Sequence, residues 1–398
     1  SLLPGSFKQY STPFDSFWCC VGTGMENHSK YAESIYFKDN QELLVNLYIP
    51  SRLHWKEKGL KLTLDTYFPE SDTVTVRMDE IGSYTGMLLF RYPDWVSGDA
   101  VVRINGKPAQ TEAHKGSYIR LLDSVKSGDV ITLVFTRNLY IDYAKDEPHF
   151  GSVMYGPILL AGGLGTDDMP EDKVIDNRAC RESLPAKNIP MLVGPLADLD
   201  SWIQCSSQHP LRFTVKNGGG QQGVGLIPYF QMHHQRHTVY WKLYSPDEFV
   251  YRTRSLTDEV KIGDEKDEGK HALQGENDSI YWHDYFWAKN TRFRMAKDGW
   301  FSYTLHINKT EQKPYHLICR FWGDEPDTCQ FDILIDGNYL RTVSLNRKLY
   351  LTYVDDVYSI PADWTRGKDK VNVTFRAAQG KNAGGLYELK ITSDTNYR

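Results

Sequence analysis

The sequence has 398 residues, 40% of them hydrophobic and 24% charged, so we expect a folded globular chain of two or three domains. The formal net charge is −5 and no basic cluster of the kind that follows a phosphate backbone is present, so we expect no nucleic-acid partner. No run approaches the roughly 18 apolar residues of a membrane-spanning helix, so we expect no membrane span.

The first chemically informative feature is a pair of adjacent cysteines, Cys19 and Cys20, in the stretch SFWCCVGTGMEN. The six residues SLLPGS at the start lack the basic and apolar regions of a signal peptide, and we interpret the chain as part of a longer protein. Residues 24–36 carry apolar side chains at helical spacing, which predicts an amphipathic helix with His28 on its core-facing side. Thr23 and Glu26 fit a capping box, which predicts that the helix begins near Gly24.

From about residue 41, apolar and polar residues alternate with the two-residue period that is typical of β-strands. Asn105-Gly106 predicts a type I′ hairpin turn, and Ser127-Gly128-Asp129 predicts another turn. Strands at spacings of roughly 8–12 residues favour antiparallel sandwiches. The predicted strands lie within residues 42–51, 60–68, 73–81, 86–92, 99–110, 117–122, 129–144 and 155–162.

The second half of the chain alternates between irregular and strand-like segments. Residues 166–210 are irregular, with a short helical pattern at 195–204, whereas residues 225–244 have strand composition. Residues 255–278 are charged and lack apolar periodicity, which predicts a linker. From about residue 280 strands return, and Asp336-Gly337 predicts a hairpin turn in a jelly-roll-like module.

The cysteine pair allows two interpretations. Adjacent cysteines do not readily bond to each other, so they could be two buried thiols that behave as small hydrophobic groups. Their position next to the predicted helix start favours the other interpretation, because backbone N–H groups and the helix dipole stabilise a thiolate there. A reactive or metal-bound thiolate is the preferred hypothesis, although two cysteines supply only half of the about four ligands of a zinc site.

These residues resemble a known family. FWCCVGTGMENH at 17–28, Lys30-Tyr31 and SIYF at 34–37 resemble the β-L-arabinofuranosidase-like glycoside hydrolases of families 127 and 146. Weaker agreement comes from RYPDW at 91–95, VRING at 102–106, YGPILLAG at 155–162 and HQRHTVYW at 234–241. The cysteine motif is specific, and the strand motifs corroborate it.

The resemblance implies an (α/α)6-barrel catalytic domain followed by β-sandwich domains. It also implies a retaining mechanism with Cys19 as the catalytic nucleophile, Cys19 and Cys20 as zinc ligands, and an arabinose-containing glycan as substrate. The implied fold class is mainly β, with tandem antiparallel β-sandwich or jelly-roll domains after a short helical remnant of the barrel. We expect residues 1–39 to end the helical domain, 40–265 to form a β-sandwich region, and 266–398 to form the jelly-roll-like module.

The family's Glu-x-Cys pair and its acid/base glutamate precede the cysteine pair, and no Glu-x-Cys occurs in this sequence. We therefore expect the chain alone to be inactive and its parent protein to be an exported, periplasmic or secreted glycosidase. The alternative from another functional class is a non-catalytic carbohydrate-binding or scaffolding β-sandwich protein.

Three further motifs have structural or functional interpretations. HHQRH at 233–237 has histidines four residues apart, but its strand-like flanks favour a structural role over a metal site. Cys319 and Cys329 flank a turn signal and would form a disulfide if their strands made a hairpin in an oxidising compartment. The aromatic segment IYWHDYFW at 280–287 would either fill the core, which we favour, or form a sugar-stacking platform.

Overall fold

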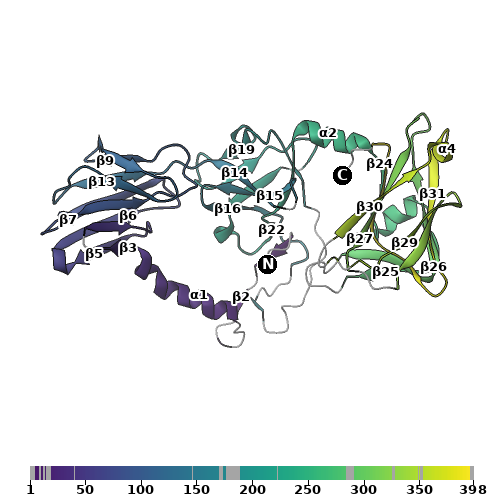
Figure 1. Ribbon diagram of the computed structural model, residues 1–398, viewed down its shortest axis with the longest axis horizontal. Helices are drawn as coiled ribbons and strands as arrows, with labels where there is room; N and C mark the ends of the chain where they lie inside the picture. Colours follow the sequence, from purple (N-terminus) through teal and green to yellow (C-terminus); the bar gives the residue numbers. More distant parts are fainter. Residues whose placement is uncertain are drawn as a thin grey trace. The chain divides into compact units, whose positions relative to one another are not determined.

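The computed structural model contains two compact units, residues 1–182 with 188–244, and residues 245–398 with 183–187 (Figure 1). The structure describes residues 5–8, 10–11, 14, 19–39, 41–145, 147–169, 174–175, 189–221, 223–283, 291–324, 328–347, 349 and 353–394. Most of the described secondary structure is β-strand, and most strand pairs are antiparallel. The prediction of a mainly β chain of sandwich domains with little helix is confirmed.

In the first unit, helix α1 leads into a two-sheet sandwich. Helix α1 covers Cys19–Lys30 and continues into the 3-10 turn η1, Tyr31–Ser34. A six-stranded sheet, β10-β9-β13-β7-β6-β5, faces a five-stranded sheet, β11-β12-β8-β4-β3. The strands are β3 Tyr36–Lys38, β4 Glu42–Val45, β5 Ser51–Trp55, β6 Leu60–Thr66, β7 Thr73–Glu80, β8 Met87–Arg91, β9 Val101–Ile104, β10 Lys107–Pro108, β11 Thr111–Ala113, β12 Tyr118–Leu121 and β13 Val130–Val134, with the 3-10 turn η2 at Lys56–Lys58.

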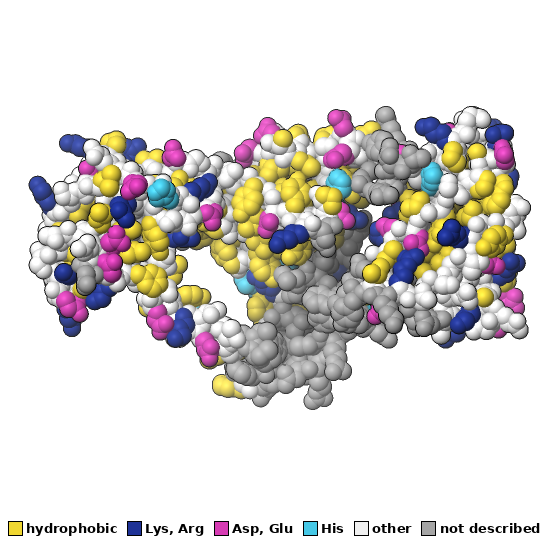
Figure 2. All heavy atoms as spheres, viewed as in Figure 1, with side chains coloured by type: hydrophobic (Ala, Val, Ile, Leu, Met, Phe, Trp, Pro, Cys, Tyr) yellow, Lys and Arg dark blue, Asp and Glu magenta, His cyan; other side chains and the backbone are white. Residues whose placement is uncertain are grey.

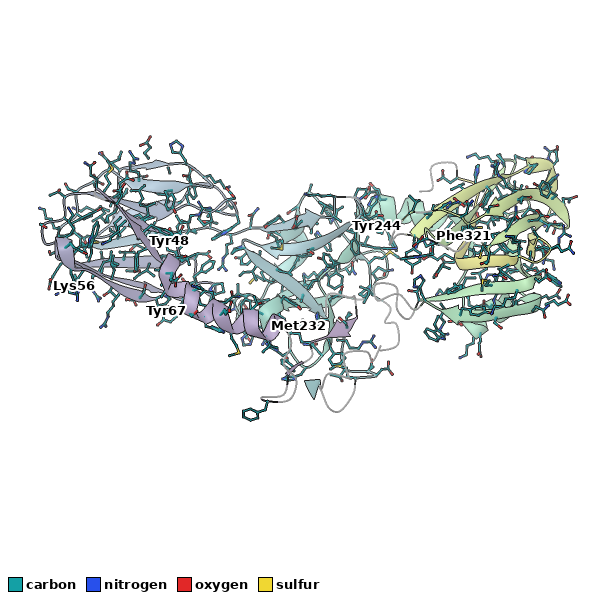
Figure 3. All side chains as sticks on the ribbon, turned by 60° about the horizontal axis from the view of Figure 1, so that its bottom comes forward. Tyr48, Lys56, Tyr67, Met232, Tyr244 and Phe321 are labelled. Carbon is teal, nitrogen blue, oxygen red and sulfur yellow. The ribbon has the colours of Figure 1, made fainter. Side chains whose placement is uncertain are left out.

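Alternating side chains of these two sheets form one apolar core. Leu62, Val76 and Phe90 are fully buried in it, as period-two patterning requires for residues on the inner face of a sheet. The Asn105-Gly106 turn has positive φ angles of 51° and 79° and joins β9 to β10 directly, so the predicted type I′ hairpin is confirmed. Figure 3 shows Tyr48 and Tyr67 in this part of the molecule, and Tyr67 is 84% exposed.

Residues 129–144, predicted as one strand, are two strands in different sheets. The backbone leaves β13 at Val134 and re-enters a second sandwich at Leu139, so the single-strand prediction is wrong. The break coincides with Arg137, whose guanidinium is buried and donates to the Asp72 carboxylate at 2.5 Å. The same guanidinium lies 4.7 Å from the centre of the Tyr155 ring. A buried, paired cation therefore marks the junction between the two sandwiches.

The second sandwich of this unit is built on a ten-stranded sheet around Leu160, Leu226 and Trp241. The predicted short helix at 195–204 is only the 3-10 turn η4, Leu199–Ser201, followed by a strand. The elements are β1 Ser6–Phe7, β2 Tyr10–Ser11, β14 Leu139–Tyr143, β15 Phe150–Tyr155, β16 Ile158–Gly163, β17 Val174–Ile175, β18 Leu192–Val193, β19 Ile203–Cys205, β20 Phe213–Val215, β21 Val224–Pro228, η5 Tyr229–Gln231, β22 Arg236–Thr238 and β23 Trp241–Tyr244.

The second unit is a single nine-stranded antiparallel sheet that encloses its own core. Its strand order is β29-β28-β31-β26-β32-β27-β30, with β24 beside β32 and β25 beside β26. Phe301 stacks on Phe375, and Phe331 meets Phe321 from another part of the sheet, so aromatic pairs lie in the core. The elements are α2 Pro246–Ser255, β24 Leu256–Val260, α3 Glu265–Lys270, β25 Gln274–Trp282, β26 Arg292–His306, β27 Tyr315–Trp322, β28 Gln330–Ile335, β29 Asn338–Ser344, β30 Tyr353–Ile360, α4 Ala362–Thr365, β31 Lys370–Ala377 and β32 Asn382–Thr392.

Residues 255–278, predicted as a linker, belong to this sheet, and the prediction is wrong. Asp264 caps α3 by accepting from the backbone N–H groups of Lys266 and Asp267. Glu268 turns inward and is 2% exposed, where it meets Arg294 of β26 in a two-pronged ion pair with N···O distances of 3.0 and 2.9 Å. The charged residues of this segment therefore include a buried, paired carboxylate, which is why their charge is not the mark of a solvated linker.

The surface mixes charges of both signs. Figure 2 shows lysine and arginine side chains interspersed with aspartate and glutamate on the face in view. Across the described helices, none has both the length and the apolar character needed to cross a membrane.

Candidate functional site

The cysteine pair opens helix α1. Cys19 and Cys20 are its first two residues, and their side chains lie outside the described part of the structure. The helix begins five residues before the predicted start at Gly24, so Thr23 and Glu26 are interior residues and the predicted capping box is wrong. Glycine inside a helix costs about 1 kcal/mol relative to alanine, which is small enough for the helix to pass through Gly22 and Gly24.

The predicted core-facing side of this helix is exposed. Met25 is 66% exposed, and His28 is exposed and makes an edge contact with Tyr31, whose ring is 49% exposed. The prediction that His28 is a core histidine is therefore wrong. Helical spacing identified apolar positions, but burial depends on what packs against them, which periodicity does not specify.

The C-terminal end of the helix is held firmly by the first sandwich. Ile35, just after η1, is buried, and its carbonyl accepts from the backbone N–H of Asn46 at 2.8 Å. The Asn46 side chain donates to the Ser34 carbonyl at 3.0 Å and accepts from the Tyr118 hydroxyl at 2.8 Å. The helix direction is thus fixed at one end by partly buried hydrogen bonds.

The segment before the helix is held by the second sandwich. Strand β1 pairs with β22, with Phe7 opposite Arg236. Arg236 is 2% exposed, and its Nε donates to the Gly5 carbonyl at 2.6 Å. Farther along, the Tyr10 hydroxyl and His233 Nδ1 are 2.5 Å apart. The cysteine motif therefore lies between two segments that are anchored on different sandwiches of the same unit.

These contacts give HHQRH a defined structural setting. Strand β22 covers its last two residues, Arg236 and His237, whereas His233 precedes the strand and contacts Tyr10. His234 has a positive φ of 55°, so the backbone turns between His233 and the strand. Burial raises the pKa of Tyr10, which favours its neutral hydroxyl next to His233.

Cys319 and Cys329 are not disulfide-bonded, so the disulfide that the sequence left open is absent. Their strands are not neighbours, because β27 pairs with β30 and β32, and Cys329 precedes β28, which pairs with β29 and β31. Both residues are buried in the core of the second unit, and burial raises the pKa of the Cys319 thiol well above its usual value. Cys205 is the exposed thiol among the described cysteines, and Cys180 lies outside the described residues.

Part of the aromatic segment 280–287 is described, and it lies on β25. Trp282 is 52% exposed and stacks beneath the Arg292 guanidinium at 4.5 Å from the ring centre. His283 meets Trp322 edge-on at 4.5 Å. Residues 284–290 lie outside the described residues, so the choice between core and platform stays a prediction for them.

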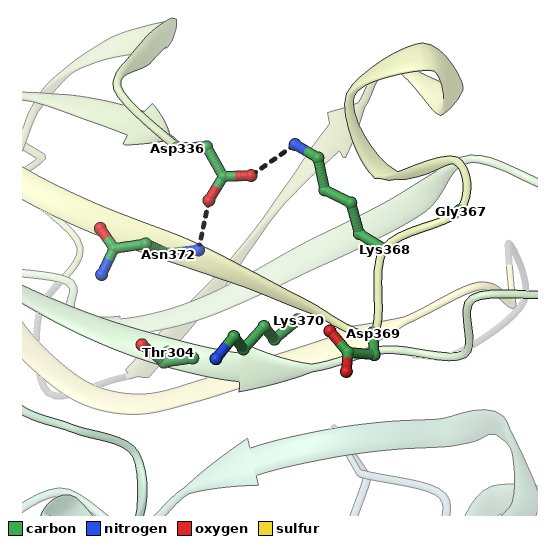
Figure 4. A pocket seen from close by; sticks show the side chains of 7 residues that line it. All are labelled: Thr304, Asp336, Gly367, Lys368, Asp369, Lys370 and Asn372. Carbon is green, nitrogen blue, oxygen red and sulfur yellow. Dashed lines mark hydrogen bonds and ion pairs between the residues drawn. The ribbon is translucent and has the colours of Figure 1, made fainter.

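The second unit has an open cavity of about 480 Å³ (Figure 4). It is lined by Thr304, Asp336, Gly367, Lys368, Asp369, Lys370 and Asn372. Asp336 accepts from the Lys368 ammonium at 2.6 Å and from the Asn372 backbone N–H at 2.8 Å. Both oxygens of that carboxylate are thus engaged in holding the loop to the sheet, which indicates a structural role.

Within the described residues, one group of side chains has the composition and proximity of a metal site. Asp258, His271 and His306 of the second unit each offer a ligand atom, and these atoms lie within 4.8 Å of one another. Sequence reasoning missed this group because its members are 13 and 35 residues apart and come from three different elements. No local spacing rule covers such a set.

Comparisons with known proteins identify the parts of the chain. The sequence model of the β-L-arabinofuranosidase GH127 middle domain matches residues 42–137. Two further domain families, both of unknown function, match residues 140–243 and 253–392. No curated protein matches the chain.

Solved structures give matches of low identity. A GH127 β-L-arabinofuranosidase from Geobacillus stearothermophilus T6 is 17% identical over 57% of this chain and 37% of its own, with a TM-score of 0.40. A second GH127 β-arabinofuranosidase is 17% identical over 61% of this chain and 42% of its own, with a TM-score of 0.41. A family 35 carbohydrate-binding module from Clostridium thermocellum is 12% identical over 30% of this chain and 90% of its own, with a TM-score of 0.22. The chain spans 37% to 42% of the length of the matched glycoside hydrolases, and at these TM-scores the likeness carries no functional argument.

Proposed function

Because the chain carries a GH127 middle domain at residues 42–137, we propose that it is the C-terminal portion of a retaining β-L-arabinofuranosidase-like glycoside hydrolase. The substrate would be an arabinose-containing glycan, and the protein would work in the periplasm or outside the cell. The observation that carries the proposal is this domain match together with the cysteine motif immediately before it.

Cys19 is the proposed nucleophile. Its place in the first turn of α1 supports this role, because the N-terminal end of a helix favours a negatively charged thiolate. The thiolate would attack the anomeric carbon while a glutamate protonates the departing glycosidic oxygen, which leaves the sugar bonded to sulfur. Water, deprotonated by the same glutamate, would then displace the sulfur and release arabinose with retained configuration.

The donor chemistry of the pair suits zinc, which binds cysteine thiolates. Cys19 and Cys20 would supply two of about four ligands, and a bound zinc ion would keep both thiols deprotonated at neutral pH. No described residue of the first unit belongs to a group of three or more possible ligands. We therefore propose that the remaining ligands and the acid/base glutamate come from an upstream helical domain, and that the present chain alone is inactive.

Hydrolysis of an aryl β-L-arabinofuranoside tests this proposal. The protein that includes the upstream helical domain should release arabinose, whereas the chain of 398 residues should not. In the longer protein, Cys19→Ser should reduce the rate at least about 1,000-fold, since the nucleophile is lost. Cys205→Ser, at an exposed thiol outside the proposed site, is the matched control and should keep full activity. Arabinose release by the present chain, or an active Cys19→Ser protein, would contradict the proposal.

The alternative, glycan binding without catalysis, has one supporting observation in the second unit. Trp282 presents an exposed ring beside a cation, a combination that suits stacking on sugars. Retention of the chain on immobilised arabinan should be lost in Trp282→Ala if this is the binding residue. The exposed aromatic Tyr67 of the first unit provides the control, because Tyr67→Ala should leave retention unchanged.

A further inference from the structure

A second metal site, separate from the cysteine pair, is indicated by the contacts of His271. This residue immediately follows helix α3 as its C-cap and is 6% exposed. Its Nδ1 lies 2.7 Å from the Asp267 carbonyl and 3.7 Å from the Asp267 carboxylate. A carbonyl oxygen can only accept, so Nδ1 carries the hydrogen and donates it. In the neutral ring the lone pair is then on Nε2.

The lone pair of His271 points at another acceptor. Nε2 lies 3.3 Å from Oδ1 of Asp258, a carboxylate that also accepts from the Glu259 backbone N–H. Two acceptors at this distance repel unless something positive lies between them. Either a second proton on the ring or a metal cation would satisfy both.

His306 brings a second imidazole to the same carboxylate. Its Nδ1 lies 3.2 Å from Oδ2 of the same Asp258, whereas His271 contacts Oδ1. A tetrahedral zinc ion with bonds of roughly 2.0–2.1 Å keeps its ligand atoms about 3.3 Å apart. Both N···O distances around Asp258 match that spacing. All three ligand atoms lie within 4.8 Å of one another, so a single cation among them would engage both imidazoles and the carboxylate.

The surroundings also resemble those of a metal ligand. Donation from the far ring nitrogen to a carbonyl or carboxylate is the usual way in which a metal-binding histidine is oriented, and Asp267 provides it for His271. Asp258 is held in place by the backbone N–H of His306, which donates to Oδ2 at 2.6 Å. The His306 side chain is 66% exposed, so water can reach the site and complete the coordination.

We propose that Asp258, His271 and His306 bind a divalent transition-metal ion, with zinc as the preferred ion. Two imidazoles and one carboxylate match zinc and its neighbours rather than calcium or magnesium, which require oxygen ligands. The ion would connect β24, the residue that follows α3 and the end of β26, three different parts of the second unit. Its effect would be to stabilise this unit.

The test is a titration of the full chain with zinc chloride in a Cys19→Ser, Cys20→Ser background, which removes the thiols of the proposed catalytic site. Calorimetry should find one zinc ion per chain. His306→Ala should weaken zinc binding at least about 100-fold. Loss of a residue that only orients a metal ligand already weakens metal binding about 10- to 100-fold, and His306 is a proposed ligand itself. This variant should fold, since the His306 side chain is exposed and its backbone N–H to Asp258 is kept.

His114→Ala is the matched control, because His114 is an exposed histidine of the first unit with a side chain that is 75% exposed. It should bind zinc as tightly as the parent. Asp258→Asn is a second variant that keeps an oxygen acceptor, and it should also lose binding. Equal zinc binding by the His306→Ala and His114→Ala proteins, or none by the parent, would overturn the proposal. Neither result depends on glycosidase activity, so this proposal and the proposed function fail separately.

Discussion

Replacing Glu268 by glutamine removes one charge from a buried cluster. Glu268 and Arg294 have side chains only 3% and 8% exposed, and they form a two-pronged ion pair. The Tyr303 hydroxyl donates to Glu268 at 2.6 Å, because burial and this carboxylate both raise the pKa of Tyr303. In the variant, the new amide N–H₂ faces an arginine N–H, so two donors meet and a buried cation loses its main partner.

The cost can be bounded from this geometry. Removing one partner of a buried ion pair typically costs about 3–5 kcal/mol. Arg294 also bonds Asp278, which keeps part of its charge compensated, so we expect the lower end, about 3 kcal/mol. Since every 1.4 kcal/mol is a factor of ten, the open form of the second unit should become roughly 100 times more populated.

Hydrogen exchange measured by mass spectrometry localises the effect. Peptides from β25 and β26 that exchange through opening of the second unit should exchange roughly 100-fold faster in Glu268→Gln, and peptides from the first unit should not change. Asp363→Asn is the control, because Asp363 pairs with Arg366 on the surface and its side chain is 81% exposed. An acceleration below about threefold, or an equal acceleration in both units, would refute the reasoning.

Three further predictions concern a glycine of the first unit, the pH dependence of stability and the reactivity of the thiols. Gly156 has a positive φ of 56°, and a Cβ there would lie 2.6 Å from Arg137 Cγ. Gly98 has a similar φ of 67°, but a Cβ there would meet open space, so Gly156→Ala should destabilise the first unit by more than Gly98→Ala. Urea denaturation of the two variants checks this prediction, and equal losses of stability would contradict it. Hydrogen bonds from Thr63 and Arg77 hold the pKa of Asp79 below its ordinary 3.8. The stability that ionised Asp79 contributes is therefore full above pH 3.8 and is lost as the pH falls through the lower pKa of the folded state. In urea denaturation between pH 6 and pH 3, the free energy of unfolding should fall less steeply with acid in Asp79→Asn, and an unchanged pH dependence would count against this role of Asp79. Iodoacetamide at pH 8 should modify Cys205 in the folded chain and spare Cys319 and Cys329 until denaturant is added. Peptide mass spectrometry measures the three rates of modification. Modification of Cys319 as fast as Cys205 would contradict the burial of Cys319.

Local chemistry made some features predictable from sequence. The Asn105-Gly106 and Asp336-Gly337 turns require positive φ at two consecutive residues, which these residue types adopt at little cost, and both turns are present. The mainly β class was predictable because apolar and polar residues alternate with a two-residue period within each strand, independently of its neighbours.

Features that depend on distant partners were not predictable. The charge of residues 255–278 indicated a linker because nothing in the segment reveals that Glu268 pairs with Arg294, 26 residues later. The exposed side of α1 and the separation of Cys319 from Cys329 likewise depend on which elements become neighbours. The group of Asp258, His271 and His306 had no sequence signal for the same reason.

The pairing of β1 with β22 has a consequence for biosynthesis. The Gly5 carbonyl and the Arg236 guanidinium that bond to each other are 231 residues apart in the chain. A ribosome that adds about 5–20 residues per second needs roughly 10–50 seconds to make that interval. During this time β1 has been synthesised but its partner β22 has not, so the nascent segment around Phe7 is unpaired. The same interval gives the sandwich of residues 42–137 time to fold. Ribosome-bound chains stopped before residue 236 should therefore expose this segment to protease and to chaperones, and longer ones should protect it.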